Sequence, residues 1–213
     1  MPVKVTMLTL YSMPSSGNSY KVRLLFALLD IPFRHVTTEY DGGAELTSTS
    51  EFREKNPTGK VPLVEFENGD LLSESNAILH YFAEGTHLVP ADKLQRARMY
   101  QWMFFEQNMH EGAIAVRSAL LTYPHRKKDA TEERLAALLK SGHAALQVME
   151  TRLQTSPYLA GDGYSIADIA LYAYTHSAEE KGGFDLSRYP GIIAWLDRIA
   201  SHNRHVDIHW PEG

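Results

Sequence analysis

Residues 56–66 read NPTGKVPLVEF, and the fold class depends on this stretch. The hydrophobic run 61–66 is typical of a buried strand, yet Pro62 stands near its start. Proline cannot donate a ladder hydrogen bond, so it is normally excluded from central strands. A cis peptide bond would account for it, because the N–H and C=O of Val61 would then face outward, able to pair with an extended peptide. An ordinary trans-proline at the first residue of a strand is the alternative.

The first eighty residues around this stretch mix strand and helix periodicities. From the N-terminus, the expected elements are a strand at residues 3–10, a helix at 21–30, a strand at 33–37, a loop with a weak helix at 41–55, strands at 61–66 and 71–72, and a helix at 75–84. The Asn68-Gly69 pair between the last two strands is a strong hairpin signal. On the final helix, we expect the core side to hold Ala77, Ile78, Tyr81 and Phe82.

After Gly85 and Pro90 the hydrophobic period becomes wholly helical. We expect helices at residues 91–121, 131–153, 165–180 and 190–200. The sequence therefore predicts an α/β domain at residues 1–84 with the order β-α-β-(loop)-β-β-α, followed by an all-helical domain at residues 91–213.

Composition excludes several classes of function. The chain has 213 residues and a formal net charge of -5, which argues against a nucleic-acid-binding face. No apolar run approaches the length of a membrane span, and the N-terminus does not look like a signal peptide, so the cytoplasm is the default expectation. Without any cysteine, the chain cannot form a disulfide, a cysteine metal site or a thiolate nucleophile of its own. Any sulfur chemistry must use a sulfur from outside.

A candidate binding corner follows the hairpin, where Ser73, Glu74 and Ser75 precede a helix. Helix N-termini bind carboxylates through unpaired N–H groups and the positive end of the dipole. A serine hydroxyl adds a donor, and Glu74 could accept from an ammonium group. A ligand that carries a carboxylate and an amine on one carbon would suit this corner. Simple N-capping by serine is the alternative.

A second candidate lies at residues 11–25, YSMPSSGNSYKVRLL, whose serines fall between the first strand and the first helix. Open sheets place ligands at this carboxyl edge of their strands. A hydroxyl there can donate to an anion with help from the helix dipole. No histidine-based triad is evident, which favours serine as a hydrogen-bond donor over serine as a nucleophile.

Taken together, these motifs resemble the glutathione transferase family over essentially the whole chain. The resembling stretches are 11–29 (YSMPSSGNSYKVRLLFALL), 56–64 (NPTGKVPLV), 73–84 (SESNAILHYFAE) and 164–174 (YSIADIALYAY). The resemblance implies a thioredoxin-like N-terminal domain and a C-terminal helical bundle. It also implies glutathione as co-substrate, an apolar electrophile held by the helical domain, a homodimer, and a role in detoxification.

By resemblance, Val61 pairs with the cysteinyl backbone of glutathione, Glu74 and Ser75 hold its γ-glutamyl end, and Lys60 contacts a carboxylate of the tripeptide. The serine classes place the catalytic hydroxyl five residues before a basic-Val pair, and counting back from residues 21–22 gives Ser16. The rivals for this role are Ser15, Asn18 and Tyr11.

Other members of the family suggest alternatives to a transferase. A glutathione-dependent reductase of peroxides or disulfides is one, and a non-catalytic module with the same fold is another. The Ser-Ser-Cys signature of the zeta class is absent, which makes maleylacetoacetate isomerase activity doubtful. Lacking cysteine, the chain cannot form a mixed disulfide with glutathione through its own thiol.

Two further motifs are assigned to structure. Ser165 and Asp168 form a predicted capping box, so Asp168→Ala should cost about 0.5–2 kcal/mol of stability without affecting glutathione binding. His202, His205 and His209 lie three and four residues apart, but the segment lacks a clear carboxylate arrangement, and we expect no metal there.

Overall fold

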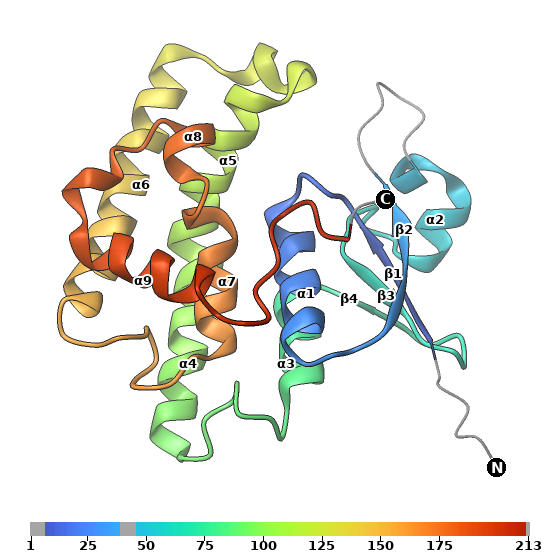
Figure 1. Ribbon diagram of the computed structural model, residues 1–213. Helices are drawn as coiled ribbons and strands as arrows, with labels where there is room; N and C mark the ends of the chain where they lie inside the picture. Colours follow the sequence, from blue (N-terminus) through green and yellow to red (C-terminus); the bar gives the residue numbers. More distant parts are fainter. Residues whose placement is uncertain (1–6, 39–45, 212–213) are drawn as a thin grey trace. The chain divides into compact units, whose positions relative to one another are not determined.

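The computed structural model describes residues 7–38 and 46–211 of the chain. These residues form two compact units (Figure 1). The first unit runs to Phe82 and also includes the C-terminal segment from Arg204, which we call the C-terminal strap. The second unit comprises Ala83–Asn203. The expected strand residues 3–6, and residues 41–45 of the expected polar loop, lie outside the described part of the chain.

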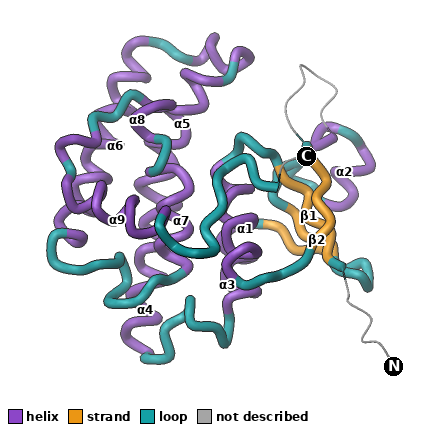
Figure 2. Tube along the Cα trace, viewed as in Figure 1, coloured by secondary structure: helices purple, strands orange, loops and turns teal. Residues whose placement is uncertain are grey.

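The first unit contains a four-stranded mixed sheet, drawn in orange in Figure 2, whose strand order is β2-β1-β3-β4. Strand β1 pairs in parallel with β2, whereas β3 is antiparallel to both β1 and β4. The elements of this unit are β1 (Leu8–Ser12), α1 (Gly17–Leu28), β2 (Phe33–Thr37), a short 3₁₀ helix (Leu46–Ser48), α2 (Ser50–Lys55), β3 (Leu63–Glu65), β4 (Leu71–Ser73) and α3 (Ser75–Ala83).

Each face of the sheet has its own core, because neighbouring residues of a strand point to opposite faces. Leu10 belongs to the cluster on the side of α1 and α3, whose buried members are Leu10, Val22, Phe26, Val64 and Ile78. Its neighbour Tyr11 belongs to the cluster on the side of α2, with Phe52 and Leu63. The sheet is therefore covered on both faces, as a thioredoxin-like domain requires.

The predicted hairpin is confirmed, with Gly69 at φ +88° in the turn between β3 and β4. Other predictions need correction. Helix α1 begins at Gly17, four residues earlier than expected, because Ser16 caps it. On α3 the buried residues include Ile78 and Leu79, whereas Ala77 is exposed and Tyr81 is 57% exposed. The expected core side of that helix was thus partly wrong.

The second unit is helical, as predicted, but two expected helices are interrupted. The long helix at 91–121 is divided by a π-helical segment, and the helix at 165–180 is divided near Ser177. The elements are α4 (Lys93–Phe105), the π-helical segment (Glu106–His110), α5 (Glu111–Thr122), a 3₁₀ helix (Pro124–Asp129), α6 (Glu132–Leu153), α7 (Ile166–Thr175), α8 (Ala178–Gly182), a 3₁₀ helix (Leu186–Arg188) and α9 (Pro190–Ala200).

The predicted capping box at the start of α7 is present, and Asp168 does more than cap. Its carboxylate accepts hydrogen bonds from the backbone and hydroxyl of Ser165, from the backbone of Leu159 and from the indole of Trp195. Asp168 is fully buried. Burial raises the pKa of this carboxyl, while the hydrogen bonds act in the opposite direction. The residue therefore joins three segments of the helical unit.

The C-terminal strap packs on the first unit, although its residues follow the helical half in sequence. Arg204 forms an ion pair with Asp30, and the hydroxyl of Tyr20 donates to the carbonyl of Val206 at 2.6 Å. Trp210 packs edge-to-face on Phe33. The strap therefore contacts both α1 and the start of β2.

None of the helices in the described part of the chain combines the length and the apolar character needed to cross a membrane.

Candidate functional site

The pairing of the strands brings three loops to one edge of the sheet. In the register, Leu63 of β3 lies opposite Tyr11 of β1 on one side and opposite Ser73 of β4 on the other. Because β3 runs antiparallel to its neighbours, its first residue lies beside the C-terminal ends of β1 and β4. The loop after β1, the residues before β3 and the start of α3 consequently leave the sheet at the same edge. These are the segments that contain the predicted site residues.

The segment before β3 has an open backbone. The Val61–Pro62 peptide bond is cis, as the sequence predicts. Strand β3 begins only at Leu63, and the backbone of Val61 makes no hydrogen bond to any other residue that the structure describes. The N–H and C=O of Val61 are thus available to an extended peptide that adds to the sheet edge.

Asn56 shapes the loop that leads to Val61. Its amide nitrogen donates to the carbonyl of Lys60 at 2.7 Å, and its amide oxygen accepts from the backbone and hydroxyl of Thr58. Asn56 is only 3% exposed, whereas the Lys60 side chain is exposed. Our sequence reasoning assigned no role to Asn56. The Asn-Pro-Thr-Gly composition was the available signal, because Asn side chains commonly bond their own backbone two residues on.

The segment after β4 turns sharply into α3. Glu74 has φ +71°, a left-handed conformation that is uncommon for a residue with a side chain, and it is exposed. Ser75, the first residue of α3, is 6% exposed, and its hydroxyl donates to the amide oxygen of Asn18 at 3.1 Å. This bond joins the first turn of α3 to the first turn of α1. Two helix N-termini, with the positive ends of their dipoles, therefore lie at the same edge.

Ser16 is the N-cap of α1, directly before the helical turn that contains Asn18. Its Oγ accepts from the backbone N–H of Ser19 at 3.4 Å, and the side chain is half-buried. An oxygen that accepts from the helix keeps its own proton for donation elsewhere. Ser16 is thus a capping residue and a potential donor to an anion at the helix N-terminus.

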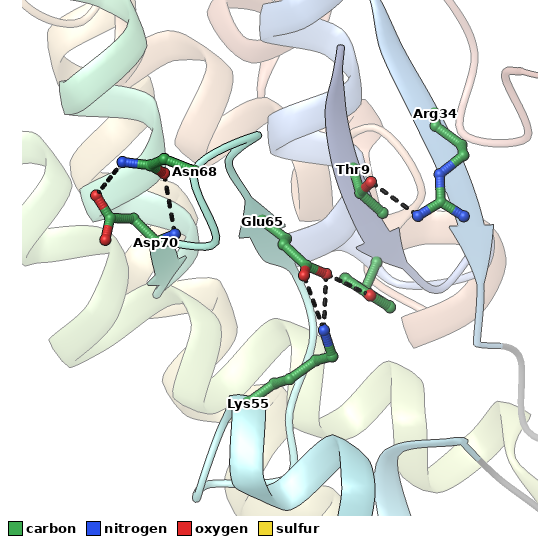
Figure 3. Close-up of polar contacts among 7 residues, drawn as sticks. Thr9, Arg34, Lys55, Glu65, Asn68 and Asp70 are labelled. Carbon is green, nitrogen blue, oxygen red and sulfur yellow. Dashed lines mark hydrogen bonds and ion pairs between the residues drawn. The ribbon is translucent and has the colours of Figure 1, made fainter. Parts of the chain in front are cut away.

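Tyr11, a rival of Ser16, is engaged within the sheet. Its hydroxyl donates to Glu65 at 2.6 Å. Lys55 bonds the same carboxylate at 2.9 Å (Figure 3). Burial and the neighbouring Glu65 carboxylate raise the pKa of Tyr11. The side chain is also packed edge-to-face on Phe52. These contacts commit the Tyr11 hydroxyl to the structure of the sheet.

Figure 3 shows two further polar contacts of the sheet. The guanidinium of Arg34 donates to the hydroxyl of Thr9 at 3.0 Å, which joins β2 to β1. In the hairpin, Asn68 and Asp70 bond each other through side chain and backbone. Both contacts lie away from the predicted site residues and serve the sheet itself.

A buried polar group behind the first loop was missed by sequence reasoning. Arg23 on α1 is fully buried and donates to the hydroxyl of Ser12 and to the carbonyls of Met13 and Pro14. Ser12 is in turn 2.7 Å from Nε2 of His35. The spacing of Ser12 and His35 resembles a nucleophile and its base, but Ser12 is fully buried and so inaccessible to a substrate. No sequence signal points to this group, since a charged residue in a helix is usually exposed.

In the helical unit, side chains of the π-helical segment and of α5 differ in their contacts. Met109 is 51% exposed and Ala113 is buried. The Arg117 guanidinium donates to the carbonyls of Gly182 and Leu135 at 2.7 and 2.6 Å, which commits it to packing within the unit. His110 is fully buried and lies 2.9 Å from the hydroxyl of Thr175.

Two of the three histidines near the C-terminus have separate side-chain contacts. His205 lies 3.2 Å from the Tyr20 hydroxyl, and the ring of His202 packs against Tyr164. Over the described residues, no three or more His, Cys, Asp or Glu side chains are grouped in a way that could hold a metal ion.

A covered mixed sheet with a cis-proline before β3 and two helix N-termini at one edge defines the class of thioredoxin-like proteins. Comparison with known families is more specific. Residues 10–87 match the model of the glutathione S-transferase N-terminal domain, and residues 113–203 match that of the C-terminal domain.

Solved structures and a curated relative agree with this match. The structure of a glutathione S-transferase from Pseudomonas fluorescens Pf-5 is 46% identical, with a TM-score of 0.89 over 95% of this chain and 98% of that one. One from Xanthobacter autotrophicus Py2 is 42% identical, with a TM-score of 0.87 over 96% and 97% of the two chains. The disulfide-bond oxidoreductase YfcG of Escherichia coli K12 is 29% identical over 92% of this chain and 91% of its own. The chain belongs to the glutathione S-transferase family.

Proposed function

We propose that this protein is a glutathione transferase that activates the glutathione thiol for attack on a small apolar electrophile. The observation that supports the proposal best is the register in which Leu63 lies opposite Tyr11 and Ser73, because it gathers the site segments at one edge. Family membership alone would not be enough, since one fold hosts several activities. In this proposal residues 1–84 form the glutathione-binding domain, and residues 91–213 supply the pocket for the electrophile.

The proposed binding roles follow from the contacts at that edge. Val61 pairs its open backbone with the cysteinyl residue of glutathione, which adds the tripeptide to the sheet as a short strand. The N-terminus of α3 and the Ser75 hydroxyl receive the γ-glutamyl carboxylate, and exposed Glu74 accepts from its ammonium group. The exposed Lys60 side chain pairs with a carboxylate at the other end of the peptide. This set of charges complements a zwitterionic tripeptide.

In the proposed mechanism, Ser16 stabilises the thiolate of bound glutathione. A thiol with a pKa near 8.5 is mostly protonated at neutral pH, and both a hydroxyl donor and the positive end of α1 favour its ionised form. The thiolate then attacks an electrophilic carbon and forms a C–S bond. With an aryl halide, the halide leaves with the electron pair of the broken bond. With an epoxide, the ring opens, the electron pair stays on the resulting alkoxide oxygen, and the alkoxide is then protonated. Proximity of the two bound reactants supplies much of the remaining rate enhancement.

Direct titration of bound glutathione tests this proposal. Thiolate absorbance in the ultraviolet, followed against pH with the protein in excess, should give a pKa below that of free glutathione. Turnover should then appear with at least one member of a panel of aryl halides and epoxides. Binding without any lowering of the thiol pKa would contradict the transferase proposal and leave a non-catalytic module as the better description.

A second candidate is a glutathione-dependent reductase, which the 29% identity to the oxidoreductase YfcG favours. Because this chain has no cysteine, both reducing equivalents would come from glutathione. Two glutathione molecules would be oxidised to one glutathione disulfide. In exchange, a disulfide substrate would be reduced to two thiols, or a hydroperoxide to an alcohol and water. Adding hydroperoxides and a model disulfide to the same assay panel separates this candidate from the transferase. Either activity fits a cytoplasmic protein, since thiols are kept reduced in that compartment.

We also propose that the protein forms a two-fold homodimer. The second unit exposes Phe104 by 65% on α4, and the first unit exposes Tyr81 by 57%. Tyr81 also lines an open depression of about 390 Å³, together with Phe66, Asn68, Asp70, Leu71 and Leu72. Phe66 and Tyr81 pack edge-to-face in this depression. Contiguous exposed apolar surface is typical of interaction sites, and a second copy is the usual partner in soluble oligomers.

Light scattering at micromolar concentration should therefore give twice the chain mass of 24.0 kDa. Phe104→Glu, which would bury a charge in the proposed interface, should shift the mass toward that of one chain. A wild-type mass of 24.0 kDa would rule out the dimer.

A further inference from the structure

Arg23 is one of two fully buried cations on α1, the other being Lys21. The Arg23 guanidinium contacts three consecutive residues, which are the last residue of β1 and the first two of the loop that follows. One terminal nitrogen donates to the hydroxyl of Ser12 at 2.9 Å and to the carbonyl of Met13 at 3.1 Å. The other donates to the carbonyl of Pro14 at 2.9 Å. The planar fork of arginine suits this task, whereas lysine presents a single point charge.

The same guanidinium also contacts the C-terminal strap. Its second terminal nitrogen donates to the carbonyl of Ile208 at 2.5 Å, in addition to Pro14. The strap is held to the unit independently by the ion pair of Arg204 with Asp30 and by the Tyr20 hydroxyl bond to Val206. Arg23 therefore joins the loop to a segment that is 185 positions away in sequence but fixed on the same unit.

The side of the loop that faces β2 is fixed by Ser12 and His35. An arginine can only donate, so the Ser12 oxygen accepts from Arg23 and has its own proton left for Nε2 of His35 at 2.7 Å. Burial and the Arg23 charge lower the pKa of His35, which favours the neutral ring with an accepting Nε2. The loop is thus held between β2, α1 and the C-terminal strap.

This loop leads directly to Ser16. Two residues beyond Pro14, the backbone N–H of Ser16 donates to the carbonyl of Met13 at 3.1 Å, and Ser16 begins α1 as its N-cap. The Met13 carbonyl is therefore shared between Arg23 and Ser16. A shift of the guanidinium would move the same carbonyl that orients the backbone of Ser16.

We propose that Arg23 is a positioning residue for thiol activation: its fork holds residues 12–14 in the shape that presents the Ser16 hydroxyl, and braces them against the C-terminal strap. The inference rests on the proposed function, since it assumes that Ser16 stabilises the thiolate. It predicts that the geometry of the fork matters and that a positive charge alone is insufficient. Misplacement of a catalytic group by about 1 Å can reduce a rate by about 10²-fold.

Arg23→Lys keeps the charge and removes the fork, while Arg23→Met removes both. We expect both variants to raise the bound-thiol pKa and to reduce kcat by about tenfold or more, with a smaller change in glutathione affinity. Tyr20→Phe is the matched control, because it removes the hydroxyl that donates to Val206 of the strap and leaves the fork of Arg23 in place, and its thiol titration should equal that of wild type. A wild-type titration for Arg23→Lys would overturn the proposal, as would an equal shift for Tyr20→Phe.

A fallback and a second readout keep the test decisive. If neither Arg23 variant folds, Ser12→Ala removes one partner of the fork and should still raise the thiol pKa; a wild-type value would overturn the proposal. Amide hydrogen exchange, measured without glutathione, should become faster at residues 13–19 in the Arg23 and Ser12 variants. If wild type shows no thiolate signal, the proposed function fails, while unchanged exchange in Arg23→Lys shows separately that the guanidinium does not hold the loop.

Discussion

Ser16→Ala should reduce turnover with glutathione by about 10²-fold or more and raise the pKa of the bound thiol. The hydroxyl is proposed to donate to the thiolate, and losing one such donor to an anion typically costs roughly 2–4 kcal/mol in the transition state. Glutathione affinity should fall only modestly, because Lys60, Val61, Glu74 and Ser75 supply the proposed binding contacts. Ultraviolet titration of the bound thiol and steady-state kinetics measure the two effects separately.

Ser75→Ala should have the opposite pattern of effects to Ser16→Ala. It removes a hydroxyl at the proposed γ-glutamyl site and the 3.1 Å bond to Asn18, so it should mainly weaken glutathione binding and leave the thiol titration close to wild type. Equal effects of both substitutions on the thiol pKa would contradict the division of roles between the two serines.

The rivals of Ser16 are tested in the same titration. Tyr11→Phe should leave the thiol pKa unchanged, because that hydroxyl already donates to Glu65 at 2.6 Å. Should Ser15→Ala or Asn18→Ala shift the titration while Ser16→Ala does not, the donor is misassigned. A serine-class site still holds if Ser15 is the residue responsible. A shift caused only by Tyr11→Phe would refute the serine-class site altogether.

Asp168→Ala should produce the largest loss of stability, and the structure raises the expected value above that of an ordinary cap. The substitution leaves buried donors on Leu159, Ser165 and Trp195 without their acceptor. Each unsatisfied buried donor costs about 1–3 kcal/mol, so a total of at least about 3 kcal/mol is expected. For a chain of this size, that corresponds to a fall in Tm of about 6–12 °C. Thermal unfolding followed by circular dichroism measures it.

Asp162→Ala is the matched control, since this exposed carboxylate lies in the segment just before the capping box. It should change stability by no more than about 0.5 kcal/mol. Glutathione affinity of folded Asp168→Ala should match wild type, because Asp168 is buried within the helical unit and has no proposed contact with the ligand. An unchanged Tm combined with lost turnover would show instead that Asp168 acts in catalysis.

Much of the fold was predictable because it depends on local patterns. The hairpin at Asn68-Gly69, the capping box of Ser165 and Asp168, and the helix at residues 190–200 were read from neighbouring residues and are confirmed. The cis bond before Pro62 was also predictable, since a proline at the head of an internal strand is tolerated when its peptide bond turns the chain. In each case the signal and the structure lie within a few residues of one another.

Contacts between distant residues were decided only by the tertiary structure. Tyr11 and Ser16 are both plausible donors in the sequence, but Glu65, 54 residues from Tyr11, engages the tyrosine hydroxyl. In the sequence, Arg23 looks like an ordinary exposed cation of a helix. The structure shows that its guanidinium donates to the carbonyl of Ile208, 185 residues away.

The physical reason is that periodicity and capping report whether a side chain is buried and how its own segment begins and ends. They do not report which residue from a distant part of the chain forms the hydrogen bond that a buried polar group needs. The sequence by itself therefore determined the elements, the family resemblance and the candidate residues. The tertiary structure decided which hydroxyls are already engaged by the protein and that the end of the chain supports the loop of Ser16.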